Sequence, residues 1–260
     1  MYLQMLLRGV QELHARGILH RDLKPNNLLL SKTQHTAKIT DFGMATMIEA
    51  PPSDEDGGDS SGAKATSKKR SIQVVTRAYR APELFFGEDE YGCEVDVWSV
   101  GCIFAELLLR EPFFDGASDI DQLSLIFKAL GSPGENGWEQ ASELPFFLRF
   151  KDTNPLPLKD QFPKELSSAG LELLSKLLQL DPTKRISIDD ALQHEFFSEE
   201  PLPADPTELE IPEDPQRQLR AAPVPPASRH ETVNAPGAAE VVVRTSENEN
   251  AFVIKGRRLA

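Results

Sequence analysis

The sequence HRDLKPNN, at residues 20–27, contains an acid, a lysine and an amide at short fixed spacings. The tripeptide DFG follows at residues 41–43, and the tripeptide APE at residues 81–83. Each motif alone is too short to be informative, because strings of three residues recur by chance. Their order and spacing form a far more specific combination, which indicates an enzyme site assembled from several short segments.

Apolar residues before the first motif recur with helical spacing. They fall at i, i+3, i+4, i+7 and i+10, which predicts an amphipathic helix that ends at Gly17: Leu3, Leu6, Leu7, Val10 and Leu13. Residues 18–30 then read as a loop between two short apolar strands. AKITDFG, at residues 37–43, reads as a strand that enters a turn.

The middle of the chain predicts further helices. VDVWSVGCIFAELLLR, at residues 95–110, is apolar on nearly every side, and such a helix must be buried in its domain. Amphipathic helices are expected at residues 121–130 and 167–180. SIDDALQHEFF, at residues 187–197, begins with a capping serine and predicts one last helix.

Two stretches lack any apolar period. Residues 49–70 are rich in Pro, Gly, Ser and charge, which predicts a flexible loop. Residues 199–260 are rich in proline and polar residues, which predicts an extended or disordered tail. The folded part is therefore expected to span about 200 residues, a normal size for one domain.

Composition excludes several classes of protein. The 260 residues carry 28 Lys and Arg against 41 Asp and Glu, a net charge of −13, so a broad basic face for nucleic-acid phosphates is not expected. Cys93 and Cys102 are too few for a disulfide framework or a zinc site. No apolar run is long enough to cross a bilayer. These features favour an intracellular, soluble enzyme.

In order, spacing and surroundings, the motifs resemble the signature set of the eukaryotic serine/threonine protein kinases. The resemblance covers roughly residues 1–198 and implies a mainly α fold, that of a kinase C-terminal lobe. Short β-hairpins are implied at the catalytic and DFG segments. The domain would include the insert at 49–70 and precede the tail at 199–260. ATP and Mg²⁺ are the implied cofactors.

The resemblance implies a role for each polar residue of the motifs. Asp22 would accept the proton of the substrate hydroxyl, and Lys24 would meet the γ-phosphate of ATP. Asn27 and Asp41 would bind Mg²⁺, a hard cation that prefers oxygen ligands. The alternative for the two aspartates and the asparagine is that they are turn and cap residues, a common use of both types.

Three residues are implied to hold the lobe together. DVWSVGC, at residues 96–102, resembles the start of the buried central helix of kinases, where Asp96 would brace the backbone of the catalytic loop. Arg185 resembles the arginine that pairs with the glutamate of the APE motif, here Glu83. Losing one partner of such a buried ion pair strands the other.

VVTRAYRAPE, at residues 74–83, resembles the substrate-binding segment of the cyclin-dependent and MAP kinases. Thr76 would contact the catalytic aspartate, and Arg80 would favour a proline after the phosphorylated Ser or Thr. Ser71 aligns with the activation-loop phosphosite of that group, with Arg21 as the partner of the phosphate. The alternative is that Ser71 is an unmodified loop serine.

Within this group the chain resembles most the cyclin-dependent kinase-activating kinases, the kinase subunits of general transcription factor H. Residues 19–30, 107–133 and 196–209 carry this resemblance. It implies a nuclear enzyme with a cyclin H-like regulatory subunit and an assembly factor. The implied protein substrates are activation loops of other cyclin-dependent kinases and the repeats of RNA polymerase II. Neither direct nucleic-acid binding nor a membrane is expected.

A complete kinase also places a glycine-rich loop over the ATP phosphates and a lysine on a strand of its N-terminal lobe. The sequence before His20 contains neither. We therefore expect the N-terminal β-lobe to be absent, the chain to be a fragment of a kinase, and the chain alone to be poorly active. The alternatives are a truncated, non-catalytic kinase that acts as scaffold or competitor, and another kinase of the cyclin-dependent or MAP type.

Overall fold

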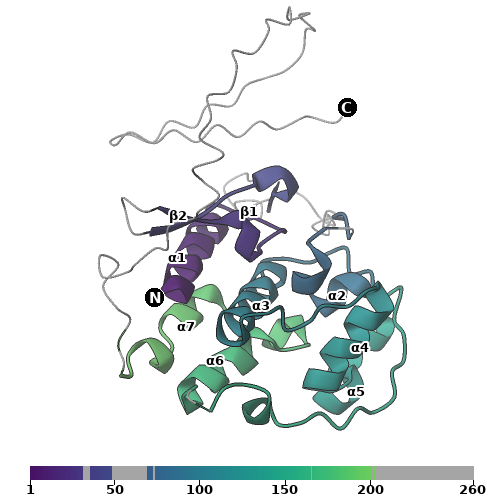
Figure 1. Ribbon diagram of the computed structural model, residues 1–260. Coiled ribbons are helices and arrows are strands. Elements are labelled where there is room, and N and C mark those ends of the chain that lie inside the picture. The colour runs from purple at the N-terminus through teal and green to yellow at the C-terminus, as the bar shows by residue number, and fades with distance from the viewer. Residues whose placement is uncertain (32–35, 49–68, 73, 165, 201, 203–260) are drawn as a thin grey trace, which may run out of the picture. The chain divides into compact units, whose positions relative to one another are not determined.

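The computed structural model describes residues 1–31, 36–48, 69–72, 74–164, 166–200 and 202 (Figure 1). The predicted insert at 49–70 lies outside the described residues except for its last two. The predicted tail at 199–260 lies outside them except for residues 199, 200 and 202. Of two compact units, Met1–Leu209 and Glu210–Ala260, the second lies wholly outside the description.

The first helix, α1, spans Tyr2–Ala15 and buries Leu3, Leu6, Leu7 and Val10, as the apolar spacing predicts. The chain leaves the helix at Gly17, whose φ of +67° lies in the left-handed region that favours glycine. This turn leads the chain directly into the strand that precedes the HRD motif.

Short antiparallel strands frame the catalytic and DFG segments, as expected. β2 (Leu28–Ser31) pairs with β3 (Thr36–Ile39), with Leu28 opposite Ile39. β1 (Ile18–Leu19) pairs with β4 (Thr46–Met47). The two ladders fix the HRD loop and the DFG turn next to each other, because each ladder joins one side of the loop to one side of the turn.

α3 (Glu94–Leu109) is the central helix. It is buried from Val95 to Ala105, as predicted, whereas Leu107 in its last turn is 45% exposed. It packs against α1 and α6 (Ser168–Leu177), and α1 packs in turn against α7 (Ile188–Leu192) (Figure 1). A helix buried on all sides must be apolar on nearly every side, which accounts for the mainly apolar sequence of its buried part.

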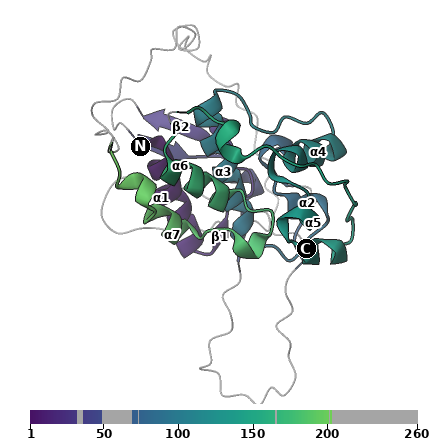
Figure 2. The same cartoon turned by 90° about the horizontal axis from the view of Figure 1, so that it is seen from below.

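A second group of helices lies to one side of α3 in both views, α2 (Pro82–Phe85), α4 (Asp119–Leu130) and α5 (Pro133–Asn136) (Figure 2). Phe86 is fully buried beneath them and stacks with Phe127 at 6.1 Å between ring centroids. The APE motif leads into this group, because Pro82 and Glu83 are the first residues of α2.

The prediction of one last helix over residues 187–197 is wrong beyond Leu192. Ser187 caps α7 by accepting a hydrogen bond from the amide of Asp190, as predicted, but α7 ends after five residues. The His194 side chain then accepts a hydrogen bond from the amide of Phe196 and starts a separate 3₁₀ turn. A side chain that bonds its own backbone competes with a continuing helix.

No described helix combines the length and the apolar character that a membrane span requires.

Candidate active site

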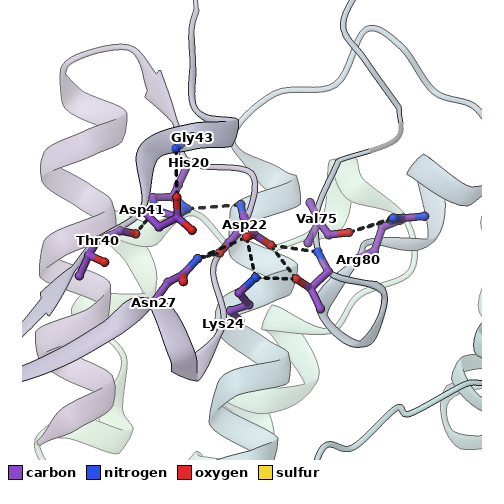
Figure 3. Close-up of polar contacts among 10 residues, drawn as sticks. His20, Asp22, Lys24, Asn27, Thr40, Asp41, Gly43, Val75 and Arg80 are labelled. Atoms are coloured by element: carbon purple, nitrogen blue, oxygen red, sulfur yellow. Dashed lines mark hydrogen bonds and ion pairs between the residues drawn. The ribbon is translucent and has the colours of Figure 1, made fainter. Parts of the chain in front are cut away.

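Asp22 lies at the centre of a hydrogen-bonded cluster and is 8% exposed (Figure 3). Its Oδ1 accepts hydrogen bonds from the amide and the hydroxyl of Thr76, at 3.0 and 2.8 Å. Its Oδ2 accepts one from Lys24 Nζ at 2.7 Å. Lys24 Nζ also donates to the Thr76 hydroxyl at 2.9 Å. Two residues, Lys24 close in sequence and Thr76 far from it, therefore fix both oxygens of one carboxylate.

The charge state of Asp22 follows from these contacts. Burial raises the pKa of the carboxyl group, but the hydrogen bonds from Lys24 and Thr76 outweigh burial and lower the pKa below its ordinary value. Asp22 is therefore ionised at neutral pH. An ionised carboxylate in this position can accept a hydrogen bond from an incoming hydroxyl group.

Asn27 and Asp41 lie on the other side of the catalytic loop (Figure 3). Asn27 Nδ2 donates to the carbonyl of Asp22 at 2.8 Å, which turns the amide oxygen of Asn27 away from Asp22. The backbone carbonyl of Asn27 accepts the amide of Thr40 at 2.9 Å, so the residue before Asp41 is held against the loop. Asp41 has a left-handed φ of 62° and is exposed.

The oxygen atoms of Asn27 and Asp41 suit a magnesium ion, which prefers hard oxygen ligands and keeps several other ligands such as water and phosphate. One oxygen of Asp41 accepts a hydrogen bond from the Gly43 amide at 3.3 Å. No cluster of three His, Cys, Asp or Glu side chains in the described part of the chain could hold a metal alone. Phosphate oxygens would have to complete the ligand set.

Asp96 holds the catalytic loop from below. Its Oδ2 and Oδ1 accept hydrogen bonds from the backbone amides of His20 and Arg21, at 2.9 and 2.8 Å, and Asp96 is fully buried. His20 is buried as well, and its ring meets Phe42 edge-on at 5.1 Å. The bracing role that the family resemblance implied for Asp96 agrees with this geometry.

His14, on α1, was not singled out from the sequence, yet it shares Asp96. Its Nε2 lies 3.0 Å from Asp96 Oδ2. Burial lowers the pKa of His14, but hydrogen bonds with Asp96 and Cys93 outweigh burial and raise the pKa to about 9. His14 is therefore protonated at neutral pH and forms an ion pair beneath the catalytic loop.

This pair predicts a pH dependence of stability. Because the folded-state pKa of His14 lies above its unfolded value of about 6.5, the pair stabilises the fold fully below pH 6.5 and loses its effect as pH rises through about 9. The free energy of unfolding should fall by up to about 3 kcal/mol over that window. Urea unfolding at several pH values measures it. In His14→Asn the free energy of unfolding should depend less on pH between about 6.5 and 9. A variant with the same pH dependence as the wild type would contradict the pairing.

Arg21 and Ser71, predicted to meet through a phosphate, are linked in the structure by a third residue. Arg21 Nε donates to the carbonyl of Met44 at 2.7 Å, and its Nη1 donates to the hydroxyl of Tyr91 at 3.0 Å. The same hydroxyl donates to the carbonyl of Ser71 at 2.6 Å. No sequence motif pointed to Tyr91, since its contacts span 70 and 20 residues.

Arg80 bonds the backbone of its own segment and not Asp22. Its Nε donates to the carbonyl of Val74 and its Nη2 to that of Val75, both at 2.9 Å (Figure 3). Val75 has a φ of 69°, a left-handed conformation that costs a β-branched residue on the order of 1–2 kcal/mol. Arg80 thus bonds the backbone carbonyl of the strained residue Val75.

Glu83 and Arg185 form the buried ion pair that the family resemblance implied. Arg185 Nη1 lies 2.7 Å from Glu83 Oε1 and Nη2 3.1 Å from Oε2, with side-chain exposures of 0% and 1%. The Arg185 guanidinium also lies 5.2 Å from the centre of the Trp98 ring. The pair thus joins Glu83 of the APE motif to Arg185, which also bonds the carbonyl of Glu94 at the start of α3.

A hollow in the structure lies away from the cluster around Asp22. A hollow of about 970 Å³ lies among the start of α1, strand β2 and the end of α3, and is lined by residues such as Leu6, Leu30 and Phe197. Neither Asp22 nor Asp41 lines it. The candidate site is therefore identified by its converging polar groups and not by this hollow.

A family model described as the protein kinase domain matches residues 1–197. Cyclin-dependent kinase D-1 of Arabidopsis thaliana is 44% identical over 211 residues, which are 81% of this chain and 49% of that protein. Cyclin-dependent kinase 20 of Homo sapiens is 44% identical over 214 residues, 82% and 57% of the two chains. Cyclin-dependent kinase 7 of Dictyostelium discoideum is 42% identical over 211 residues, 81% and 54%.

Among solved structures, the CAK complex from Chaetomium thermophilum bound to ATP-gamma-S contains a similar chain. The TM-score is 0.69 and the sequence identity 37%, over 80% of this chain and 61% of that one. The chain spans about half the length of the curated relatives it matches.

Proposed function

The chain belongs to the protein kinase family, and we propose that it transfers the γ-phosphate of ATP to serine or threonine residues that precede proline. One observation carries the proposal. The ionised carboxylate of Asp22 is fixed by Lys24, Asn27 and Thr76 beside the two oxygen-bearing side chains suited to magnesium. A fixed acceptor next to a metal–phosphate site is what phosphoryl transfer to an alcohol requires.

In this proposal Asp22 orients the substrate hydroxyl and receives its proton. A general base works best with a pKa near the working pH, and the lowered pKa of Asp22 makes it a weak base. Phosphoryl transfer proceeds through a loose transition state in which little proton transfer is needed early. The main contribution of Asp22 is therefore alignment of the hydroxyl oxygen.

Lys24 and the magnesium ligands balance negative charge in this proposal. Lys24 holds Asp22 and Thr76 together, and its side chain is 23% exposed, so that a phosphoryl oxygen can approach its ammonium group. Asn27 and Asp41 would hold Mg²⁺, which neutralises charge on the phosphate groups of ATP. Fixed positive charge at the reacting phosphate stabilises the transition state.

The preference for proline follows from the carbonyl group of Val75. In most substrate peptides the residue after the phosphorylated Ser or Thr carries a backbone N–H group. This group needs a hydrogen-bond partner when it is buried. Arg80 already takes the Val75 carbonyl at 2.9 Å, so that N–H group would stay unpaired. Proline has no N–H group and avoids the penalty. An unpaired buried donor costs about 1–3 kcal/mol.

The bonded Val75 carbonyl predicts a specificity that depends on Arg80. The kinase should phosphorylate a Ser-Pro peptide about 10–100-fold more efficiently, by kcat/KM, than the matched Ser-Ala peptide. Arg80→Leu should narrow that ratio to within about threefold, because the Val75 carbonyl becomes available. Steady-state kinetics with both peptides measure it. An unchanged ratio in Arg80→Leu would show that Arg80 does not set the preference.

The cellular role is proposed from the relatives. Similarity to cyclin-dependent kinase 7 and to a chain of a CAK complex supports a nuclear kinase with a cyclin H-like partner and an assembly factor. Activation loops of other cyclin-dependent kinases and the repeats of RNA polymerase II are the proposed substrates. Cyclin-dependent kinase 20 of Homo sapiens and cyclin-dependent kinase D-1 of Arabidopsis thaliana are both 44% identical to the chain. This similarity favours a second candidate, another cyclin-dependent kinase with different substrates.

The experiment is to isolate the native protein and identify the cyclin bound to it, then to assay transfer from labelled ATP to both substrates. A cyclin H-like subunit and phosphorylation of either substrate support the first candidate. A different cyclin, with neither substrate phosphorylated, supports the second.

The size of the native protein tests whether this chain is part of a longer kinase. A native product near 29 kDa without transferase activity would favour the non-catalytic scaffold or competitor.

A further inference from the structure

Tyr91 lies between the APE segment and helix α3, and nothing described above gives it a role in the reaction. Its side chain is 1% exposed. A buried tyrosine often serves only to fill space, in which case its hydroxyl needs no more than one partner. The hydroxyl of Tyr91 instead has two partners, and they belong to the two segments that must be aligned for catalysis.

The first partner is the catalytic loop. The Tyr91 hydroxyl accepts a hydrogen bond from Arg21 Nη1 at 3.0 Å, and Arg21 is the residue next to Asp22. The backbone amide of Arg21 is in turn fixed by Asp96. The second partner is the carbonyl of Ser71, to which the hydroxyl donates at 2.6 Å. One hydroxyl group can donate once and accept twice, so both bonds can exist together.

The segment at residues 69–71 is attached to the same region by further contacts. Arg70 Nη1 donates to the carbonyl of Tyr91 at 2.6 Å, and the Arg70 amide donates to the carbonyl of Asp89 at 2.8 Å. Lys69 forms an ion pair with Asp89 at 2.9 Å. Of these contacts, only those of the Tyr91 hydroxyl reach the catalytic loop.

We propose that Tyr91 is a positioning residue. Its hydroxyl joins Arg21 of the catalytic loop to Ser71, just before the substrate-binding segment, while Ser71 carries no phosphate. The hydroxyl engages one donor, Nη1, of the guanidinium group that a phosphate on Ser71 would also engage. Phosphorylation of Ser71 then reinforces an existing connection and does not create it. For its effect on activity this inference rests on the proposed function; for its effect on the segment it does not.

The direct test is amide hydrogen exchange of the Tyr91→Phe variant, which keeps the buried ring and removes only the hydroxyl. Two amides report on the segment, those of Arg70 and Thr76, which donate to the carbonyl of Asp89 and to Asp22 Oδ1. Both should exchange about tenfold faster than in the wild type, because a hydrogen bond to a charged partner is lost. Amides of helix α6 should be unchanged.

Tyr79→Phe is the matched control. Tyr79 is also buried, at 8% exposure, and its hydroxyl donates to Glu106 Oε2 at 2.7 Å, away from the catalytic loop. This variant should leave the exchange of the Arg70 amide unchanged. Equal exchange in Tyr91→Phe and the wild type, or equal acceleration in Tyr79→Phe, would overturn the proposal. If Tyr91→Phe does not fold, Arg21→Met breaks the same connection and carries the same expectation.

Kinetics of the native protein separate positioning from general stability. Tyr91→Phe should raise the KM for the Ser-Pro peptide about tenfold and leave the KM for ATP unchanged, and phosphate on Ser71 should restore the peptide KM. Ser71→Ala in the wild-type background should change the peptide KM by less than about threefold. A large loss in Ser71→Ala would contradict the inference. A wild-type protein without any activity contradicts the proposed function alone, and the exchange experiment then decides on Tyr91.

Discussion

Replacing Asp22 by asparagine should lower kcat for peptide phosphorylation in the native protein by about 10²–10⁴-fold, the usual effect of losing a group that receives a proton. Asparagine has nearly the same shape, so contacts with Thr76 can persist, but it cannot hold an ionised acceptor at the substrate hydroxyl. The KM for ATP should change little, because Asp22 is not among the groups placed to bind magnesium. Steady-state kinetics at saturating ATP measure both constants.

The control for this variant is an exposed aspartate outside the cluster. Asp152 lies exposed in the segment before the 3₁₀ turn at Leu158–Asp160, and Asp152→Asn should leave kcat unchanged. Thermal unfolding of both variants shows whether the fold is intact. A kcat for Asp22→Asn within about threefold of the wild type would contradict the role assigned to Asp22.

The largest expected effect on stability belongs to Arg185. Arg185→Met should destabilise the fold by about 3–5 kcal/mol, because it leaves the fully buried carboxylate of Glu83 without its partner. The same change also removes hydrogen bonds from Arg185 to the backbone carbonyls of Glu94 and Gln179. Urea unfolding at neutral pH, with the slope compared between variants, measures the loss.

A surface pair provides the matched control for that prediction. Lys176 and Glu172 lie 2.7 Å apart on α6 with side-chain exposures of 43% and 55%, so Lys176→Met should cost at most about 0.5 kcal/mol. The double variant Glu83→Leu and Arg185→Met should be less destabilised than Arg185→Met alone, since no buried charge remains. A loss below about 1 kcal/mol in Arg185→Met would show that the pair does not hold the lobe together.

Helices with a strong apolar period could be predicted from the sequence. The helix expected around Leu3–Leu13 is Tyr2–Ala15, and the buried helix expected over residues 95–110 is Glu94–Leu109. The pattern works there because burial of one face, or of every face, decides the structure. It fails at residues 187–197, where the side chain of His194 bonds the backbone and splits the helix.

The motif residues were predictable as a set, but their supports were not. Val75 adopts a left-handed backbone against the preference of a β-branched residue, and it does so because Arg80 bonds its carbonyl from five positions away. His14 and Tyr91 act through contacts with Asp96, Arg21 and Ser71 that only the folded chain creates. Local propensity contains no information about contacts of this kind, and such conflicts cluster at functional sites.

If the proposed function is right, Asp22, Asn27 and Asp41 converge on one metal-bound nucleotide. Paramagnetic broadening of backbone amide resonances by Mn²⁺ and ATP in the isotope-labelled chain tests this convergence. We expect selective broadening at Asn27, Asp41 and Gly43, none in helix α6, and loss of the selective effect in Asp41→Asn. Broadening spread over exposed acidic residues, or unchanged in Asp41→Asn, would contradict it.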